Sequence, residues 1–196
     1  MSDFAESRAS FACETNNKAV NEIFQSRLQD FQVRTEIGSQ VASNDKASLF
    51  SLYEGNMKPT FEAIGEYDRD EKYNEIFNEE SRIVMLEQKN HLKAFVSLRF
   101  DTEEGEDDRI YAVVYLYELQ VEKDCRGKKI GKRCIDALNT LTKHLKLDKT
   151  MLTVSKSLDN PFAVKFYSNN QFIFDEIDPS WYEGGEDENY HIMSRV

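Results

Sequence analysis

The chain has 196 residues, a length that suits one globular domain with a substantial core. Its 36 acidic residues outnumber its 25 lysines and arginines, and the formal net charge of −11 argues against binding along a nucleic-acid backbone and favours a basic partner. Acidity that serves solubility alone is an equally open explanation. No apolar run approaches the roughly 18 residues of a membrane span, and the first residues lack the pattern of a secretory signal, so we expect no membrane contact.

Cysteine and histidine usage bears on the chemistry. The three cysteines form no CxxC pair, which predicts free thiols in a reducing compartment rather than disulfides or a zinc site. The three histidines argue against a histidine-based metal centre or a Ser-His-Asp triad. We therefore expect a reaction without a metal.

The first third of the chain is predicted to be helical. Apolar residues at helical spacing run from Val20 to Phe31, after Asn16 and Asn17 as possible caps. A short extended segment is expected at residues 33–37. The run 43–45 indicates a helix cap before a second helix, and residues 73–77 suggest one or two further helical turns.

The period then changes to that of strands. Residues 82–87 and 92–100 are predicted as strands separated by a turn, and residues 102–108 as an acidic turn. The β-branched and aromatic run 110–121 is typical of a buried central strand. The middle of the chain therefore predicts an antiparallel meander of three strands.

The last third alternates helices and strands. A charged turn at 122–129 precedes an amphipathic helix at 130–145, then a strand at 151–154, a helix opened by Asn160 and Pro161, a strand at 172–177, an acidic loop at 183–188 and a last strand at 190–193. This order predicts an α/β fold, a mixed twisted sheet with helices on both faces.

The turn between the central strand and the amphipathic helix carries the most chemical information. It reads Arg-Gly-Lys-Lys-Ile-Gly over residues 126–131. A strand-to-helix turn with small residues presents backbone N–H groups at a helix N-terminus, which suits a pyrophosphate. Lys132 and Arg133 extend the positive run in an acidic chain, which predicts a local cationic pocket. An ordinary basic turn is the alternative.

This turn resembles the acetyl-CoA-binding motif of the GCN5-related N-acetyltransferase (GNAT) superfamily, Arg/Gln-x-x-Gly-x-Gly/Ala. Arg126 and Gly131 match its first and last positions, and Lys129 stands where the family has its first glycine. Glycine there lets the backbone approach the pyrophosphate without a Cβ. Lys129 can still donate its N–H if its φ is negative, and its ammonium adds a charge, so we expect altered geometry at this position.

A second segment supports the same resemblance. Residues 160–167 read Asn-Pro-Phe-Ala-Val-Lys-Phe-Tyr and precede Phe172, as in the family pattern Asn-x-x-Ala-x-x-Phe-Tyr…Phe, with Gln171 in place of a glycine. The resemblance implies that Asn160 helps to hold the cofactor and that Tyr167 faces the acetyl-CoA sulfur, where a phenol can assist the departing thiolate. Without the upstream turn, Tyr167 would be interpreted as a core aromatic residue.

Four further segments are similar to the NatD family of N-terminal acetyltransferases, which are selective for histones of types 4 and 2A. These are residues 98–103, 115–122, 151–154 and 190–195. The resemblance extends from about residue 47 to residue 195. It implies a GNAT fold, acetyl-CoA as co-substrate, activity without an auxiliary subunit, and a location in nucleus and cytoplasm.

The NatD resemblance implies that Glu118 accepts the proton of the substrate's α-amine, a group whose pKa lies near 8. Strand alternation puts Tyr115 and Tyr117 on one face and Glu118 on the other, unless a β-bulge of the kind found in GNAT folds intervenes. Such a bulge would let Glu118 and Tyr117 act in one cleft with Tyr167. The alternative for Glu118 is a surface carboxylate at a strand end.

Asp101 and Glu103 share a strand face, and the resemblance implies that they contact the arginine of a tail beginning Ser-Gly-Arg-Gly. A solvated acidic turn is the alternative, and it is stronger for residues 104–108. NatD has a tyrosine near the position of Phe61, so a hydroxyl is missing there unless Tyr53 or Tyr67 supplies it. The implied peptide contacts are Phe61, Asp101, Glu103, Tyr115, Tyr117 and Tyr190.

The resemblance also assigns a cofactor site, which spans the end of the central strand, the cationic turn and the two helices that follow. Its members are Leu119, Gln120, Val121, Arg126, Gly127, Lys128, Lys129, Ile130, Gly131, Lys132, Asn160, Ala163, Phe166 and Tyr167.

We accordingly expect a GNAT acetyltransferase domain at residues 46–196 and an N-terminal helical extension at residues 1–45 that packs on it. The expected activity is direct transfer of acetyl from acetyl-CoA to the N-terminal serine of basic histone tails, with Glu118 as general base. Two alternatives remain open. One is a GNAT enzyme for a small polyamine-like amine, and the other is a weakly active acyl-CoA-binding module.

Overall fold

The structure is a computed structural model that describes residues 2–14, 17–156 and 161–196. The helices of these ranges are α1 (Ser2–Cys13), α2 (Asn17–Arg27), α3 (Ser43–Ala63), α4 (Arg69–Ile76), α5 (Ile130–His144) and α6 (Pro161–Asn169). The strands are β1 (Gln32–Ile37), β2 (Arg82–Gln88), β3 (His91–Glu104), β4 (Ile110–Val121), β5 (Lys149–Ser155), β6 (Ile173–Phe174) and β7 (Tyr190–Arg195).

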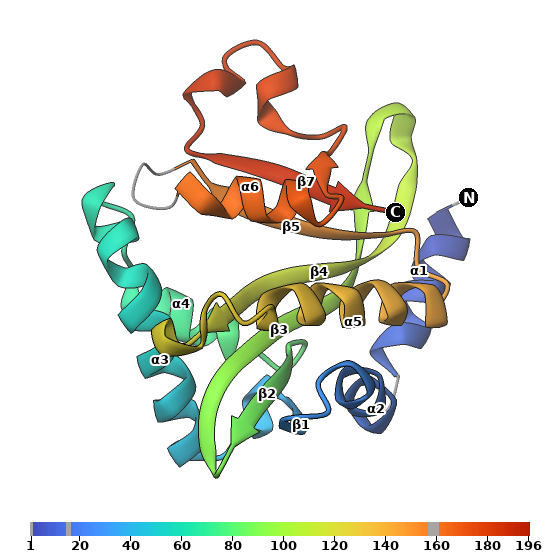
Figure 1. The fold of residues 1–196 in the computed structure, drawn as a ribbon. Helices are drawn as coiled ribbons and strands as arrows, with labels where there is room; N and C mark the ends of the chain where they lie inside the picture. Colours follow the sequence, from blue (N-terminus) through green and yellow to red (C-terminus); the bar gives the residue numbers. More distant parts are fainter. Residues whose placement is uncertain (1, 15–16, 157–160) are drawn as a thin grey trace.

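The strands form one mixed sheet in the order β1-β2-β3-β4-β5-β7-β6 (Figure 1). Neighbouring strands run antiparallel except β4 and β5, which are parallel. A parallel pair needs a crossover, and α5 provides it. The predicted meander of β2, β3 and β4 is confirmed.

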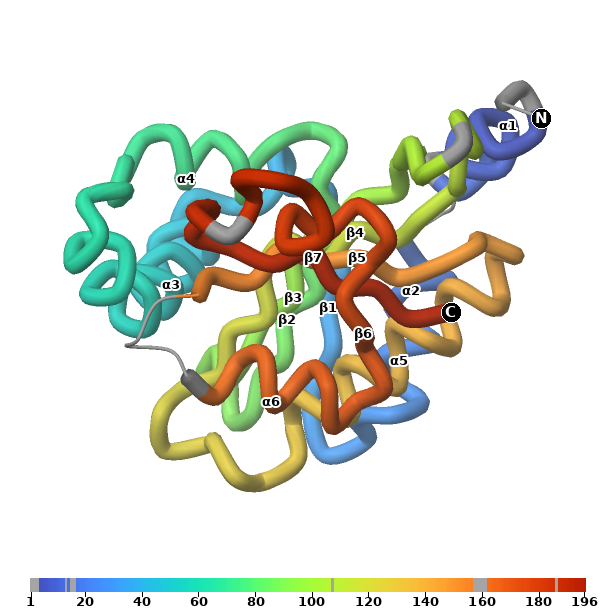
Figure 2. The backbone as a smooth tube through the Cα atoms, turned by 90° about the horizontal axis from the view of Figure 1, so that it is seen from above, coloured from blue at the N-terminus to red at the C-terminus, as the bar shows by residue number. Residues whose placement is uncertain are grey.

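Helices cover both faces of the sheet, as predicted. One face carries the larger core, in which buried residues of α1, α2 and α5 meet those of β2–β5, with α6 packed at its edge. The other face carries a smaller core under α3 and α4, with Phe50, Tyr53 and Ile76 against Ile83, Met85 and Phe95. Seen from above, α3 and α4 lie on the opposite side of the strands from α5 and α6 (Figure 2).

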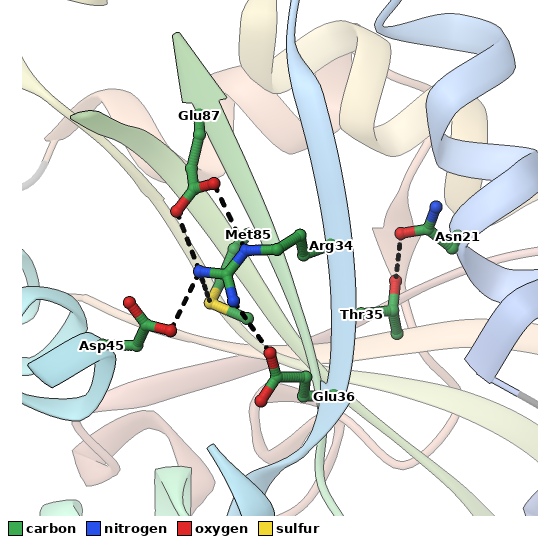
Figure 3. A network of polar contacts seen from close by, with 7 residues as sticks. All are labelled: Asn21, Arg34, Thr35, Glu36, Asp45, Met85 and Glu87. Carbon is green, nitrogen blue, oxygen red and sulfur yellow. Dashed lines mark hydrogen bonds and ion pairs between the residues drawn. The ribbon is translucent and has the colours of Figure 1, made fainter. Parts of the chain in front are cut away.

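Of residues 1–45, those that the structure describes contribute to the same sheet and core as the rest of the described chain. β1 pairs with β2 along its whole length, and Phe24 and Val33 are buried in the larger core. Arg34 of β1 lies among three carboxylates, 2.9 Å each from Glu36, Asp45 and Glu87, which join β1 to α3 and β2 (Figure 3). The boundary at residue 45 itself stays a prediction.

Three local expectations were wrong in detail. Residues 43–45 were expected to cap the helix from outside, but they form its first turn; the N-cap residue is Ala42, whose side chain cannot accept a hydrogen bond, and Asp45 pairs with Arg34. Strand β3 continues through residues 102–104, which pair with β4, so the acidic turn is shorter than expected. β6 spans two residues, and the N–H of Asp175 still donates to the carbonyl of Ile192 on β7. Beyond it the chain leaves the sheet edge, where the Asp175 and Asp178 side chains bind Lys149 and the N–H of Ile192.

Candidate active site

A cleft of about 930 Å³ opens where β4 and β5 diverge. In the described chain the two strands pair from Val113–Lys149 to Leu116–Leu152 and separate after that point. Residues 119–121 of β4 line one side of the opening, and residues 153–155 of β5 line the other. The cleft is therefore a gap within the sheet itself, open to the N-terminal ends of α5 and α6.

The backbone edge of β4 faces this gap. The N–H of Glu122 donates to the carbonyl of Lys93 on β3 at 2.9 Å. Because successive N–H groups of a strand point to opposite sides, those of Leu119 and Val121 are directed away from β3. The carbonyl of Val121 accordingly accepts from the side chains of Asn56 and Arg126, at 3.2 and 3.3 Å.

A β-bulge marks the point where the cleft begins. Ser97 pairs with Glu118, and the next pair is Leu98 with Leu116, so Tyr117 is an extra residue on β4. The bulge resets the alternation of side chains, and Glu118 joins Tyr115 and Tyr117 on the face covered by α3 and α4. The predicted bulge is confirmed, and it brings Tyr117 and Glu118 into the lining of one cleft.

Glu118 is buried, with 7% of its surface exposed, and is not the surface carboxylate of the alternative interpretation. Its Oε1 lies 3.0 Å from Lys72 Nζ, and its Oε2 accepts a hydrogen bond from Gln120 Nε2 at 2.7 Å. Gln120 Oε1 accepts in turn from Asn56 at 3.0 Å. Burial raises the pKa of Glu118 above its usual range, while the positive charge of Lys72 and the Gln120 hydrogen bond act against that rise.

The cationic turn ends at the N-terminus of α5. Lys129 is the N-cap residue, and no side chain caps the helix, so the first N–H groups of α5 lack a side-chain partner. Lys129 was expected to have a negative φ if its N–H is to donate to the pyrophosphate, but the φ of Lys129 is +63°. The chain needs a left-handed residue to turn into the helix, and the glycine of the resembled motif would adopt that conformation without strain.

The positive side chains of this region divide into two groups. Arg126, Lys129 and Lys132 line the cleft, whereas Lys128 lies outside its lining. Arg133 was wrongly placed in the cationic pocket. It donates to the carbonyl of Arg27 at 2.8 Å and pairs with Asp30, so it ties α5 to the segment after α2.

Helices α5 and α6 meet at the cleft. A Cβ on Gly131 would lie 3.1 Å from the Phe166 ring, so this glycine allows the close approach of the two helices. Phe166 and Ala163 of α6 line the cleft together with Gly127 and Ile130. Asn160, which sequence reasoning assigned to the cofactor, lies outside the described residues.

Tyr167 lines the same cleft from α6, opposite β4. Its ring packs edge-on against Phe166 and Phe172, with centroids 5.1 and 5.5 Å away. Burial raises the pKa of its hydroxyl, and the negative charge of Glu118 adds to the effect. Tyr167 therefore stays a neutral phenol that can donate a proton or a hydrogen bond.

The residues expected to bind peptide fall into two sets. Phe61, Tyr115, Tyr117 and Tyr190 line the cleft, and the Tyr115 and Tyr117 rings lie 5.1 Å apart. Burial raises the pKa of Tyr115 to about 12, and its hydroxyl lies 2.5 Å from Thr153 Oγ1.

Asp101 and Glu103 lie outside the cleft lining, on β3, where they pair with Val113 and Tyr111 of β4. Burial, reinforced by the charge of Asp101, raises the pKa of Glu103. The hydroxyl missing at Phe61 does not come from Tyr67, which donates to Glu54 at 2.6 Å.

Sequence reasoning missed most of the residues that α3, α4 and the loop between them contribute to the cleft, namely Asn56, Met57, Thr60, Glu66, Lys72 and Glu75. One signal could have found α4, because Asp68 caps it and accepts from the N–H groups of Asp70 and Glu71. That start places Lys72 and Glu75 one turn apart on the same helix face. A smaller pocket of about 160 Å³ adjoins the cleft here and is lined by Glu66, Asp68, Glu71 and Glu75 among others.

One group of side chains in the described chain brings three metal-type ligand atoms within 4.8 Å of one another, namely Glu122, Asp124 and Cys125. Lys93 pairs with Glu122 at 2.6 Å, and burial raises the pKa of the Cys125 thiol. Glu122 is therefore engaged in an ion pair and Cys125 is a neutral thiol. Cys125 and Cys134 are buried free thiols.

None of the described helices has the length and hydropathy to cross a membrane.

Comparison with known proteins agrees with this geometry. The model of the Acetyltransferase (GNAT) family matches residues 49–172, well over half of the chain. The match covers the meander, the cationic turn, α5 and α6, which together build the cleft. The chain is an acetyltransferase of the GNAT family, and its sheet and helices confirm the expected GNAT fold.

Solved structures share the fold at low sequence identity. The PaiA N-acetyltransferase of Thermoplasma acidophilum, solved with coenzyme A, is 16% identical with a TM-score of 0.55, over 84% of this chain and 98% of that one. Naa50 of Arabidopsis thaliana, solved with the bisubstrate analogue CoA-Ac-MVNAL, is 18% identical with a TM-score of 0.54, over the same shares of the two chains. Ard1 of Thermoplasma volcanium is 14% identical with a TM-score of 0.53, over 84% and 97%.

Proposed function

We propose that this protein transfers an acetyl group from acetyl-CoA to the α-amine of a basic protein N-terminus of the Ser-Gly-Arg-Gly type, as found on histones of types 4 and 2A. The observation that carries the proposal is the buried carboxylate of Glu118, held at the bulge in the same cleft as the phenol of Tyr167. Such substrates agree with the expected location in cytoplasm and nucleus.

The cleft suits acetyl-CoA as co-substrate. The N–H groups at the start of α5 and the side chains of Arg126, Lys129 and Lys132 would hold the pyrophosphate. The N–H groups of Leu119 and Val121 face the gap between β4 and β5, where an extended pantetheine chain can accept from them. Two of the solved neighbours with this fold, PaiA and Naa50, contain a coenzyme A moiety.

The chemistry is a direct transfer between two bound substrates. The α-amine nitrogen attacks the thioester carbonyl, a C–N bond forms, and the C–S bond breaks. The amine proton passes to Glu118, and the thiolate takes a proton from Tyr167, which is neutral because burial raises its pKa. The N–H of Leu119 is directed into the gap and would polarise the carbonyl. Proximity of the two substrates supplies much of the rate.

The substrate side of the cleft supports a cationic substrate. Glu66, Glu75 and Glu118 line it, and Asp101 and Glu103 lie beyond the two tyrosines of β4, where the third residue of an extended tail would reach. A guanidinium between two carboxylates forms paired hydrogen bonds. Without an auxiliary subunit, α1, α2 and β1 would brace the domain through the larger core.

A small polyamine is the second candidate, because the acidic side pocket near Glu71 and Glu75 would also suit a short chain of amines. An acetylation assay with labelled acetyl-CoA and mass spectrometry separates the two. A Ser-Gly-Arg-Gly peptide should gain one acetyl group at its α-amine, while spermidine and a peptide with a blocked N-terminus should not react.

In the same assay, Glu118→Gln should lower kcat/KM by about 10²- to 10⁴-fold, the usual contribution of a general base. Reaction of spermidine alone would replace the proposed function with the second candidate. Binding of acetyl-CoA without turnover of any of these amines would leave an acyl-CoA-binding module.

A further inference from the structure

Lys72 lines the cleft, and the reaction described above gives it no part. It lies in α4, and its side chain is 20% exposed. Its ammonium is 3.0 Å from Glu118 Oε1, 2.5 Å from Glu75 Oε1, and 5.6 Å from the centre of the Tyr53 ring. Glu75 and the aromatic face of Tyr53 therefore help to hold the Lys72 ammonium against Glu118, the proposed general base.

The helix that carries Lys72 is anchored to the bulge. Arg99 of β3 donates to the carbonyl of Glu75 at 2.7 Å and to Ser81 Oγ at 3.1 Å. The same guanidinium lies 4.3 Å from the centre of the Tyr117 ring, on the bulged residue of β4. Arg99 thereby holds α4 and the bulge in one arrangement, which keeps Lys72 in reach of Glu118.

The two oxygens of Glu118 are held from opposite sides. Lys72 binds Oε1, and Gln120, itself oriented by Asn56, donates to Oε2. A carboxylate offers about four acceptor positions, so the group can still accept from an incoming amine or a water. An ionised carboxylate buried without a cation would take up a proton and lose its capacity as a base.

We propose that Lys72 is a positioning residue that keeps Glu118 ionised and oriented at the bulge, ready to accept the proton of the substrate amine. The inference rests on the proposed function, in which Glu118 is the base. The charged and titratable groups that act on Glu118 from the packed elements are Lys72 and Glu75 of α4, Tyr53 of α3 and Tyr167 of α6.

The two charges on α4 act on Glu118 with opposite sign. The positive charge of Lys72 lowers the pKa of Glu118, and the negative charge of Glu75 raises it. Removing Lys72 should therefore raise the pKa and move the acid limb of kcat/KM to higher pH. Removing the charge of Glu75 should move the same limb to lower pH. A role in folding alone would not produce shifts of opposite sign.

The experiment measures kcat/KM against pH with the Ser-Gly-Arg-Gly peptide. We expect Lys72→Gln to shift the acid limb upward by about one pH unit or more, with activity recovering at high pH. Lys72→Arg should largely restore the wild-type profile, and Glu75→Gln should give a smaller downward shift. Lys58→Gln is the matched control, because Lys58 pairs with Glu62 on the outer side of α3 and should leave the profile unchanged.

An NMR titration of the Glu118 carboxyl carbon, assigned with Glu118→Gln, tests the inference without turnover. The Lys72→Gln protein should titrate at higher pH than wild type, and thermal unfolding should show that it is folded. An unchanged titration or an unchanged acid limb would overturn the role of Lys72. A fall in KM at constant kcat would instead show that Lys72 competes with the substrate amine. If the wild-type protein does not acetylate the peptide but Glu118 still titrates at higher pH in Lys72→Gln, the proposed function is overturned and the effect of Lys72 on Glu118 stands.

Discussion

Among the non-glycine residues with a left-handed backbone, two stand where the resembled family patterns have glycine. Lys129 has a φ of +63° and Gln171 a φ of +68°, and both stand where the resembled patterns have glycine. The left-handed conformation costs a non-glycine residue roughly 1–2 kcal/mol. The fold therefore keeps both turns in spite of the strain. At Lys129, the strained residue also places a positive charge in the lining of the cleft.

We expect Lys129→Gly to raise the free energy of unfolding by about 1 kcal/mol, because it relieves that strain. It should also raise the KM for acetyl-CoA about two- to fivefold, since one exposed cation is lost near the pyrophosphate. Chemical denaturation and steady-state kinetics measure the two effects. Lys146→Gly is the matched control, because Lys146 has a φ of +55° at the far end of α5 and should change stability alone. A stabilised Lys129→Gly protein with unchanged KM would exclude the lysine from the cofactor site.

At the scale of elements, the contact between α5 and α6 shapes the cofactor half of the cleft. Gly131 and Phe166 meet there, and the same helix α5 is tied by Arg133 to the segment after α2. The start of α5 is thus fixed on one side by an aromatic ring of α6 and on the other by the N-terminal segment. These two contacts, with Phe166 and with the segment after α2, set the direction in which the first N–H groups of α5 point.

Replacing Gly131 with leucine should separate the two helices at this point. We expect a loss of about 1–3 kcal/mol in the free energy of unfolding from overpacking, and a clearly raised KM for acetyl-CoA as the Phe166 ring moves. Gly55→Leu is the control, because Gly55 lies in α3 with open space around its Cβ, and a better helix former should stabilise by up to about 1 kcal/mol. Equal effects at the two glycines, measured by thermal unfolding, would contradict the close-approach argument.

At the scale of the whole molecule, a chain with a net charge of −11 has a cleft whose two sides carry different charges. Carboxylates gather on the substrate side near α4, while lysines and an arginine surround the start of α5. An anionic thioester and a cationic tail would therefore approach from sides of matching charge. Such fields attract ligands over a distance of about one Debye length, roughly 10 Å at 0.1 M salt.

Raising the salt concentration from 50 to about 300 mM should lower kcat/KM for a Ser-Gly-Arg-Gly peptide several-fold through screening. A peptide with glutamine in place of arginine should start lower and respond less. Paired substitution of Asp101→Asn and Glu103→Gln should flatten the salt dependence of the arginine peptide, while Asp70→Asn, on the exposed side of α4, should not. Identical salt responses of the two peptides would remove Asp101 and Glu103 from recognition.

Much of the fold was predictable because local patterns determine it. The β-branched run of β4 ended where predicted, and the apolar stripe of α5 identified the crossover helix. Segments whose structure depends on distant partners were less predictable. Asp45 resembles a cap residue, yet it binds Arg34, and residues 102–104 resemble a turn, yet they pair with β4.

The candidate site divides in the same way. Tyr167, Gly131 and Glu118 were identified because short motifs carry them, and they line one cleft. Lys72, Asn56 and Glu75 carry no motif, and contacts between segments more than 40 residues apart bring them to Glu118 and Gln120. Arg133 follows the cationic turn in the sequence and was therefore predicted to join its pocket. In the structure it pairs instead with Asp30, in the segment after α2.

The short seam between β4 and β5 has a mechanical consequence. In the described chain four residue pairs join the two halves of the sheet, so β1–β4 and β5–β7 resemble two leaves of a hinge. A ligand seated in the gap would add hydrogen bonds along the unpaired edge of β4 and act as a temporary strand. Amide exchange at Leu119 and Val121 would slow on its arrival, and an inhibitor with an extended amide backbone could stiffen the protein in the same manner.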